Sequence, residues 1–292
     1  MSTRSATLAG FGAALLWASL GLLTAASGPV PPFQLLALTF ATGGLLGVAG
    51  WSLRPDAARA LRQRPAVWAL GVGGLFGYHA LYFAALKLAP PAEAGRGAYL
   101  WPRLIVLCAA ALPGARLHGR AVAGACLGLA GIVVLGAGRT SFADAPAWPG
   151  YLCALAAAFV WAGYSVLSRR VRDVPTDAVT GFCLATAALG LACHLALEET
   201  VWPETASAWL AIALNGLGPV GAAFYLWDIG VKRGDIRLLG VGSYAIPVAS
   251  TAILVGAGYG EPSLSLGLAA VLIAAGAAVA TVRARSGRTR CV

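Results

Sequence analysis

The sequence predicts an all-α polytopic membrane protein in which ten transmembrane helices form an inverted repeat of five plus five around a central cavity. Three observations predict it: an apolar composition, ten apolar stretches of membrane-spanning length, and basic residues concentrated in alternate connections. Of 292 residues, 59% are hydrophobic and 11% are charged, and the mean hydropathy is +0.78. A water-soluble domain usually carries about twice that share of charged residues.

The apolar stretches approach the roughly 20 residues that a helix needs to cross a bilayer. The first follows Arg4, as a secretory signal would, but its apolar run exceeds the ~7 to 15 residues of a signal core, so we keep it as a span. Little chain is left over for a soluble domain. The predicted spans cover residues 7–26, 33–53, 67–88, 94–112, 121–137, 150–167, 178–197, 208–231, 238–257 and 264–282.

The formal net charge is +10, and most of the basic residues lie in the connections between these spans. If the N-terminus is cytoplasmic, the outer side keeps only Lys87, Arg96 and Arg139, and this positive-inside bias predicts that both termini are cytoplasmic. The distribution argues against nucleic acid as a partner. The predicted inner basic residues are Arg4, Arg54, Arg59, Arg62, Arg64, Arg116, Arg120, Arg169, Arg170, Arg172, Lys232, Arg233, Arg237, Arg283, Arg285, Arg288 and Arg290.

The two halves of the chain repeat one another. A nearly constant shift relates Trp17 to Trp161 and Tyr82 to Tyr225. Because five spans per repeat is an odd number, the second half enters the membrane the opposite way up, as in many secondary transporters. We therefore divide the chain into a first repeat, residues 1–138, and a second, inverted repeat, residues 139–292.

A Gly-x-Tyr-x-x-Pro pattern stands in the fourth span of each repeat, at residues 97–102 and 242–247. Pro102 and Pro247 each remove an amide donor and crowd the carbonyl four residues back. Such a break is tolerated in a bilayer only where protein or a water-filled cavity satisfies the backbone. Matching breaks in two halves predict hinges beside a substrate site near the midplane.

With these features the chain resembles the drug/metabolite transporter superfamily, specifically the ten-helix EamA-type permeases, and among them the bacterial inner-membrane exporters of aromatic amino acids. The resemblance implies a cavity lined by spans one, three, four, six, eight and nine that alternates between the two sides of the membrane. The first repeat departs from the family pattern, with Ala115 where a glutamate is expected. The matching residues are Trp17, Trp161, Pro102, Pro247, Gly260 and Glu261.

An aromatic and polar stripe marks the third span, where Tyr78, His79 and Tyr82 share one helical face. They form either a wall of the cavity or packed core and interfacial aromatics, and a histidine within a span favours the cavity. Flat aromatic walls suit a substrate with a ring, and they also suit a planar cation. The further predicted cavity residues are Trp17, Tyr99, Trp101, Trp161, Tyr225 and Tyr244.

Polar residues within the spans give further candidates. Arg103 either meets a substrate carboxylate or binds exposed carbonyls and polar neighbours. Asp228 precedes Lys232 by four residues, which favours an ion pair near the inner end over a proton-carrying carboxylate. Ser165 and Ser243 are additional polar contacts, unless each bonds to its own helix.

The function predicted is export of aromatic, and other neutral, amino acids by alternating access, without obligatory proton exchange because the spans show no buried acid pair. The alternatives are a multidrug or metabolite exporter, a passive channel, and a membrane-embedded lipid enzyme, although no catalytic constellation is evident. The cysteines have no metal-ligand spacing. We expect no metal, no cofactor and no protein partner, and we expect a small-molecule substrate and a bacterial inner membrane.

Overall fold

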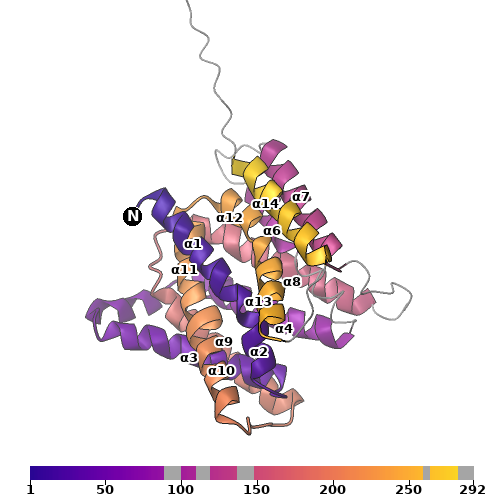
Figure 1. Ribbon diagram of the computed structural model, residues 1–292. Coiled ribbons are helices and arrows are strands. Elements are labelled where there is room, and N and C mark those ends of the chain that lie inside the picture. Colours follow the sequence, from indigo (N-terminus) through magenta and orange to yellow (C-terminus); the bar gives the residue numbers. More distant parts are fainter. Residues whose placement is uncertain (89–99, 110–118, 137–147, 259–263, 282–292) are drawn as a thin grey trace, which may run out of the picture.

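The computed structural model describes residues 1–88, 100–109, 119–136, 148–258 and 264–281, and in these ranges the regular structure is entirely helical (Figure 1). Tyr99, Gly260 and Glu261 lie outside the described residues. The first half contains α1 (Thr3–Ala18), α2 (Leu20–Ala26), α3 (Pro32–Trp51), the short η1 (Pro55–Leu61), α4 (Pro65–Leu88), α6 (Trp101–Ala109) and α7 (Gly119–Gly136).

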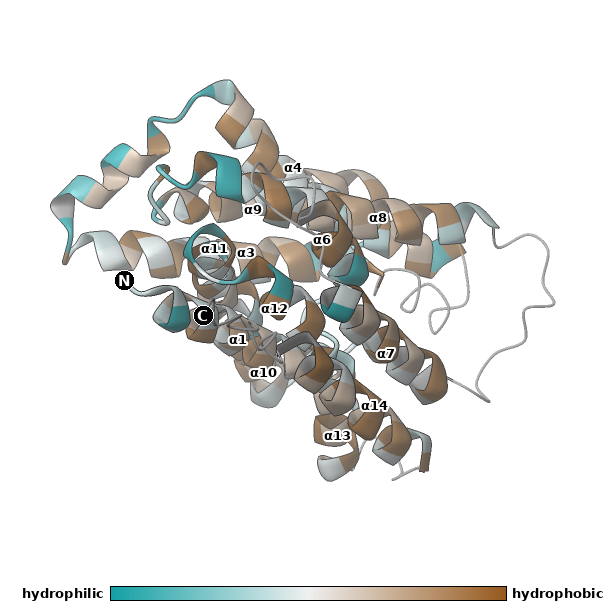
Figure 2. Cartoon of the chain, turned by 90° about the horizontal axis from the view of Figure 1, so that it is seen from above, coloured by the Kyte–Doolittle hydropathy of each residue, from teal (hydrophilic) through white to brown (hydrophobic). Residues whose placement is uncertain are grey.

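The second half contains α8 (Trp148–Leu167), η3 (Ser168–Val171), α9 (Ala178–Leu197), α10 (Ala206–Leu217), the π-helical turn η4 (Gly218–Ala222), α11 (Ala223–Arg233), α12 (Ile236–Gly242), α13 (Ala245–Gly256) and α14 (Leu264–Thr281). Within the described residues, seven helical segments are long and apolar enough to cross a membrane, and shorter apolar helices accompany them. Apolar residues cover most of the helices, and hydrophilic residues gather in connections (Figure 2). The protein is therefore a multi-pass membrane protein.

Helices from the two halves pack against one another along their lengths. The closest pairs are α3 with α9, α4 with α8, α1 with α11, and α7 with α14. Small residues allow this approach: a Cβ on Gly230 of α11 would lie 2.7 Å from the Gly10 Cα of α1, and one on Gly43 of α3 would lie 2.9 Å from the Gly221 Cα. The halves therefore interleave as one bundle.

Four basic segments meet at one end of this bundle, which we call the arginine-rich end. Arg54, after α3, pairs with Asp177 before α9 at 3.0 Å. Arg169, after α8, donates to the Gly234 carbonyl after α11 at 2.9 Å, and the Asp235 amide donates to Thr7 near the start of α1 at 2.9 Å. The described connections beside α1, α3, α8 and α11, which were predicted to be cytoplasmic, thus come together in space.

The two predicted hinge prolines occupy first turns of helices. Pro247 is the third residue of α13, which a turn at Ser243 and Tyr244 separates from α12. The Ser243 carbonyl accepts from the Ile246 amide at 3.1 Å, so the backbone at this break is satisfied locally. Pro102 is the second residue of α6, where a missing amide costs no helical bond.

Candidate functional site

A cavity of about 70 Å³ lies where the two halves meet, and we call it the chamber. Helices from both halves supply its walls. Five predicted site residues line it, together with three residues that the sequence analysis did not single out. The lining residues are Trp17, Tyr78, His79, Trp101 and Trp161, and then Leu20, Phe224 and Ile246.

The chamber walls are aromatic rings in mutual contact. Trp17 of α1 and Trp161 of α8 meet edge to face, with ring centroids 5.5 Å apart. Tyr78 contacts Trp161 at 5.4 Å, and Trp101 approaches the same indole at 6.3 Å. Trp161 therefore sits at the centre of the network, and it faces Trp17, the residue with which the sequence analysis matched it.

Hydrogen bonds fix two of the indole rings. The Trp17 Nε1 donates to the Pro219 carbonyl at 2.8 Å, within the π-turn η4. A π-turn leaves backbone groups that differ from those of a regular helix and often accompanies a functional site. The Trp227 Nε1 donates to the Ser165 Oγ at 3.1 Å, directly behind the chamber. Ser165 is fully buried, so it orients an indole and does not line the cavity.

His79 is held among aromatic rings. Its Nδ1 lies 2.7 Å from the Leu75 carbonyl of its own helix. The Phe40 and Tyr78 rings each meet the imidazole edge to face with centroids 5.1 Å apart. His79 is also one of the residues that line the chamber.

Other predicted site residues lie beside the chamber or away from it. Tyr82 stacks on Tyr78 one turn further along α4, with centroids 5.9 Å apart. The Tyr225 hydroxyl lies 3.0 Å from Thr180 and donates to the Gly43 carbonyl at 3.2 Å, so this ring joins α11 to α3 and α9.

The fourth span of each predicted repeat, residues 94–112 and 238–257, supplies one described lining residue to the chamber. These residues are Trp101 and Ile246. Ser243 is buried and donates to the Leu239 carbonyl at 2.7 Å, as a serine bonded to its own helix does. Tyr244 is fully buried against α7 at Gly128. Arg103 lies near Tyr244 and is not among the lining residues.

The π-turn explains why Phe224 faces the chamber and Tyr225 does not. One additional residue per turn rotates the following helix by about 100° relative to a regular helix. After η4, Phe224 and Trp227 turn toward Trp17, with centroid distances of 5.8 and 5.1 Å. In the sequence, the spacing of three residues between Phe224 and Trp227 indicates this face of α11. The sequence analysis chose Tyr225 instead because it matches Tyr82.

Below the chamber, toward the arginine-rich end, side chains of the same helices are buried and pack closely. Trp227 is fully buried and Tyr164 is 3% exposed. Asp228 and Lys232 form the predicted i to i+4 ion pair, with 2.9 Å between Oδ1 and Nζ, but the pair is buried, with side chains 2% and 4% exposed.

Both charges have second partners in the connection between α8 and α9. The Thr176 hydroxyl donates to Asp228 at 2.7 Å, and Lys232 donates to the Val174 carbonyl at 2.9 Å. The space left among these groups is about 10 Å³, close to that of one water molecule. We call this layer the seal; its residues are Tyr164, Val174, Thr176, Trp227, Asp228 and Lys232.

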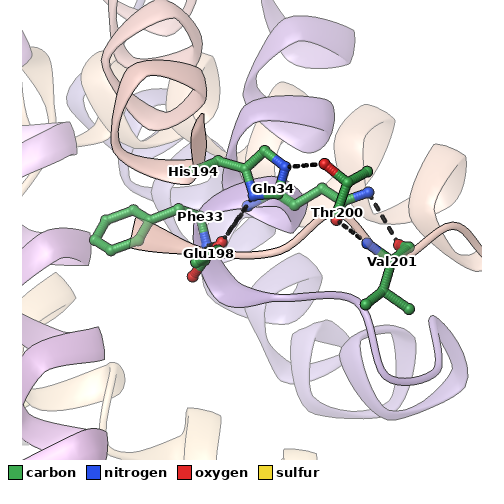
Figure 3. Close-up of polar contacts among 6 residues, drawn as sticks. All are labelled: Phe33, Gln34, His194, Glu198, Thr200 and Val201. Carbon is green, nitrogen blue, oxygen red and sulfur yellow. Dashed lines mark hydrogen bonds and ion pairs between the residues drawn. The ribbon is translucent and has the colours of Figure 1, made fainter. Parts of the chain in front are cut away.

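The opposite end of the bundle holds a second buried polar cluster, between α3 and the end of α9 (Figure 3). The Glu198 carboxylate accepts from the Phe33 and Gln34 amides, each at 3.1 Å, and so caps the N-terminus of α3. His194 lies 3.1 Å from this carboxylate and 2.9 Å from the Thr200 hydroxyl. Gln34 exchanges two hydrogen bonds with the Val201 backbone, both 3.0 Å.

No group of three histidine, cysteine, aspartate or glutamate side chains within the described ranges is placed to hold a metal ion. The cysteines described in the structure are free thiols. The described lining residues of the chamber present aromatic faces, an imidazole, the Tyr78 phenol and indole N–H groups. The arrangement can enclose a flat ring and offer it a few hydrogen bonds.

The chain is similar to known proteins over nearly its whole length. The model of the EamA-like transporter family matches residues 4–137 and, separately, residues 148–282. The chain is 59% identical over 98% of its length to a protein of Ancylobacter novellus named aromatic amino acid exporter YddG, which it covers completely. Proteins of the same name from Salmonella typhimurium and Escherichia coli are 29% and 27% identical, each over 87% of this chain and 88% of the relative.

A crystal structure described only as that of a protein matches with a TM-score of 0.92. The two chains are 58% identical, and the match covers 96% of this chain and 98% of the other. The helices described above therefore have the arrangement of a known fold.

Proposed function

The chain belongs to the EamA-like transporter family, and from this premise we propose that it exports aromatic amino acids across the inner membrane of a bacterium. The family consists of transporters, so the protein is a transporter and not an enzyme. The relatives named for this activity cover nearly the whole chain, the first at 59% identity.

The observation that carries the substrate class is the ring-lined chamber between the halves. Each well-placed aromatic pair adds about 0.5 to 1.5 kcal/mol beyond the burial of apolar area. A substrate ring between Trp17, Tyr78 and Trp161 would form several such pairs. A planar drug-like cation would also fit aromatic faces, and a multidrug or other metabolite exporter is the second candidate.

Transport by alternating access is supported by the size of the chamber and by its closed side. A cavity of about 150 Å³ in another protein holds one benzene molecule, whereas the chamber measures about 70 Å³. An aromatic amino acid therefore requires the walls to move. The buried side chains of the seal leave about 10 Å³ on the side of the arginine-rich end, which supports a conformation closed toward that end.

An inverted repeat of ten crossings is supported by the packing of the helices. In the proposed repeat, α1 corresponds to α8, α3 to α9, α4 to α11 and α7 to α14. If each helix is replaced by its counterpart, the contact of α4 with α8 becomes the contact of α11 with α1. The contacts of α3 with α9 and of α7 with α14 remain the same. This is the contact pattern of a pseudo-twofold axis. Because the basic connections meet at one end, we assign that end, and both termini, to the cytoplasm.

We further propose that the substrate moves down its own gradient. Among the described residues that line the chamber there is no carboxylate to carry a proton. The nearest acid on α11, Asp228, is engaged by Lys232 and Thr176 within the seal. Obligatory proton exchange would need a carboxylate with access to both sides.

Purified protein in liposomes tests this proposal. Efflux of labelled phenylalanine or tryptophan should saturate, show countertransport with unlabelled substrate, and persist when a protonophore collapses the pH gradient. Efflux that does not saturate would indicate a channel, and complete loss with the protonophore would contradict facilitated movement. Cells that overproduce His79→Ala or Trp101→Ala should retain aromatic amino acids that cells with the wild-type protein export. If both variants export as well as the wild-type protein, the site assignment is contradicted.

A further inference from the structure

We propose that His79 recognises the α-ammonium group of the substrate by accepting a hydrogen bond from it at Nε2. This inference rests on the proposed function and deepens it, because it assigns the polar end of the substrate to one atom of the chamber. It would make His79 the residue that separates amino acids from ring compounds of similar size that lack an amine.

The tautomer of His79 follows from its hydrogen bond. A backbone carbonyl only accepts, and the Nδ1 lies 2.7 Å from the Leu75 carbonyl, so the proton of the ring is on Nδ1. The surrounding Phe40, Tyr78 and Phe224 rings offer no carboxylate to stabilise a doubly protonated ring. The Nε2 of the neutral ring is therefore an acceptor.

The direction of this acceptor follows from the same contact. Nδ1 is the nitrogen nearer the Cβ, and it faces the previous turn of α4. The opposite edge of the ring therefore points away from its own helix, and the side chain lines the chamber. No residue that the structure describes bonds to Nε2, which leaves the lone pair available to a ligand.

The remaining polar groups of the chamber are the Tyr78 hydroxyl, which both donates and accepts and has a partner of its own, and indole N–H groups, which only donate. The Trp17 Nε1 is occupied by the Pro219 carbonyl. Trp161 and Trp101 also line the chamber, and each carries an indole N–H that can only donate. An amino acid carries one group that only donates, the ammonium, and one that only accepts, the carboxylate. The His79 acceptor suits the ammonium, and the indole N–H groups suit the carboxylate.

Binding of two ligands to the purified protein tests this assignment: phenylalanine, and 3-phenylpropionate, which lacks the ammonium group. A hydrogen bond to a charged group changes affinity by about 10- to 100-fold, so the wild-type protein should prefer phenylalanine by that factor. In His79→Phe the preference should fall to within about threefold, with 3-phenylpropionate still bound, by the same reasoning. His79→Gln keeps a donor and an acceptor and should retain most of the preference.

Equal affinity of the wild-type protein for the two ligands would overturn the inference without using any variant. An unchanged preference in His79→Phe would also overturn it. If His79→Phe weakened tryptophan and tyrosine but not phenylalanine, the donor would be on the substrate ring and the ammonium assignment would be wrong. Failure of the wild-type protein to bind any aromatic amino acid would instead contradict the proposed function.

Discussion

The chamber and the seal lie about one helical turn apart on the same two helices, yet they are built differently. On α8, Trp161 lines the chamber and Tyr164 belongs to the seal; on α11, Phe224 lines the chamber and Asp228 the seal. The chamber holds about 70 Å³ between neutral rings, whereas the seal leaves about 10 Å³ around a buried ion pair.

This difference separates recognition from closure. Contacts between aromatic rings are individually weak and tolerate small displacements, which suits walls that must admit and release a substrate. A buried ion pair gains energy only in its exact geometry and costs several kcal/mol when one partner is lost. Changes in the chamber should therefore alter substrate affinity, and changes in the seal should alter stability.

The largest effect is expected from breaking the ion pair of the seal. Asp228→Asn leaves Lys232 buried without its counter-charge, and we expect a loss of about 3 to 5 kcal/mol in the free energy of unfolding. Chemical denaturation of the purified protein in detergent measures it. The double variant Asp228→Leu with Lys232→Met removes both charges and should recover most of the loss. An unchanged unfolding midpoint in Asp228→Asn would contradict the role of the pair.

A smaller effect, on transport, is expected on the chamber side of α11. Phe224→Leu keeps an apolar side chain but removes a ring that contacts Trp17, Phe40 and Trp161. The KM for aromatic substrates should rise about tenfold, the equivalent of one or two ring pairs. Initial rates of efflux from liposomes at several substrate concentrations measure it.

Tyr225→Phe is the matched control on the adjacent residue. Its hydroxyl bonds to Thr180 and Gly43, outside the chamber. This variant should cost about 1 kcal/mol of stability and leave KM nearly unchanged. If Tyr225→Phe raised KM and Phe224→Leu did not, the face of α11 that the π-turn presents would be assigned wrongly.

The two ends of the α3 and α9 pair allow a comparison of an exposed contact with a buried one, and the exposed one should have the smallest effect of all. The Arg54 and Asp177 pair is exposed, with Arg54 61% exposed, so Arg54→Ala should change stability by less than about 1 kcal/mol. Glu198→Gln weakens a buried cap of α3 and should cost about 1 to 3 kcal/mol. Denaturation of both variants under one condition compares them; an equal cost would show that burial does not distinguish the two ends.

Much of this architecture could be predicted from the sequence because the membrane imposes simple rules. Apolar length and basic connections predicted segments that are helical in the structure, and the sequence match of Trp17 with Trp161 singled out two rings that both line the chamber. Spacing alone predicted the Asp228 and Lys232 pair, which is confirmed. These features depend on local order along the chain.

The remainder depends on contacts that no local pattern contains. The π-turn at Gly218–Ala222 changes the face of α11, and a regular helical period does not foresee it. The Glu198 cap joins residues 165 positions apart. Burial of the ion pair also required the fold, since its sequence position near a helix end suggested an exposed site. Ile246 could have been found, because it stands directly before Pro247 as Trp101 stands before Pro102.

The position of a bound substrate tests the central claim most directly. Crystals of the protein grown with 4-bromophenylalanine should show an anomalous bromine signal in the chamber, between Trp17 and Trp161 and within contact distance of Tyr78. Bound substrate whose ring lies outside this chamber, against the lipid-facing surface or in another part of the bundle, would contradict the account.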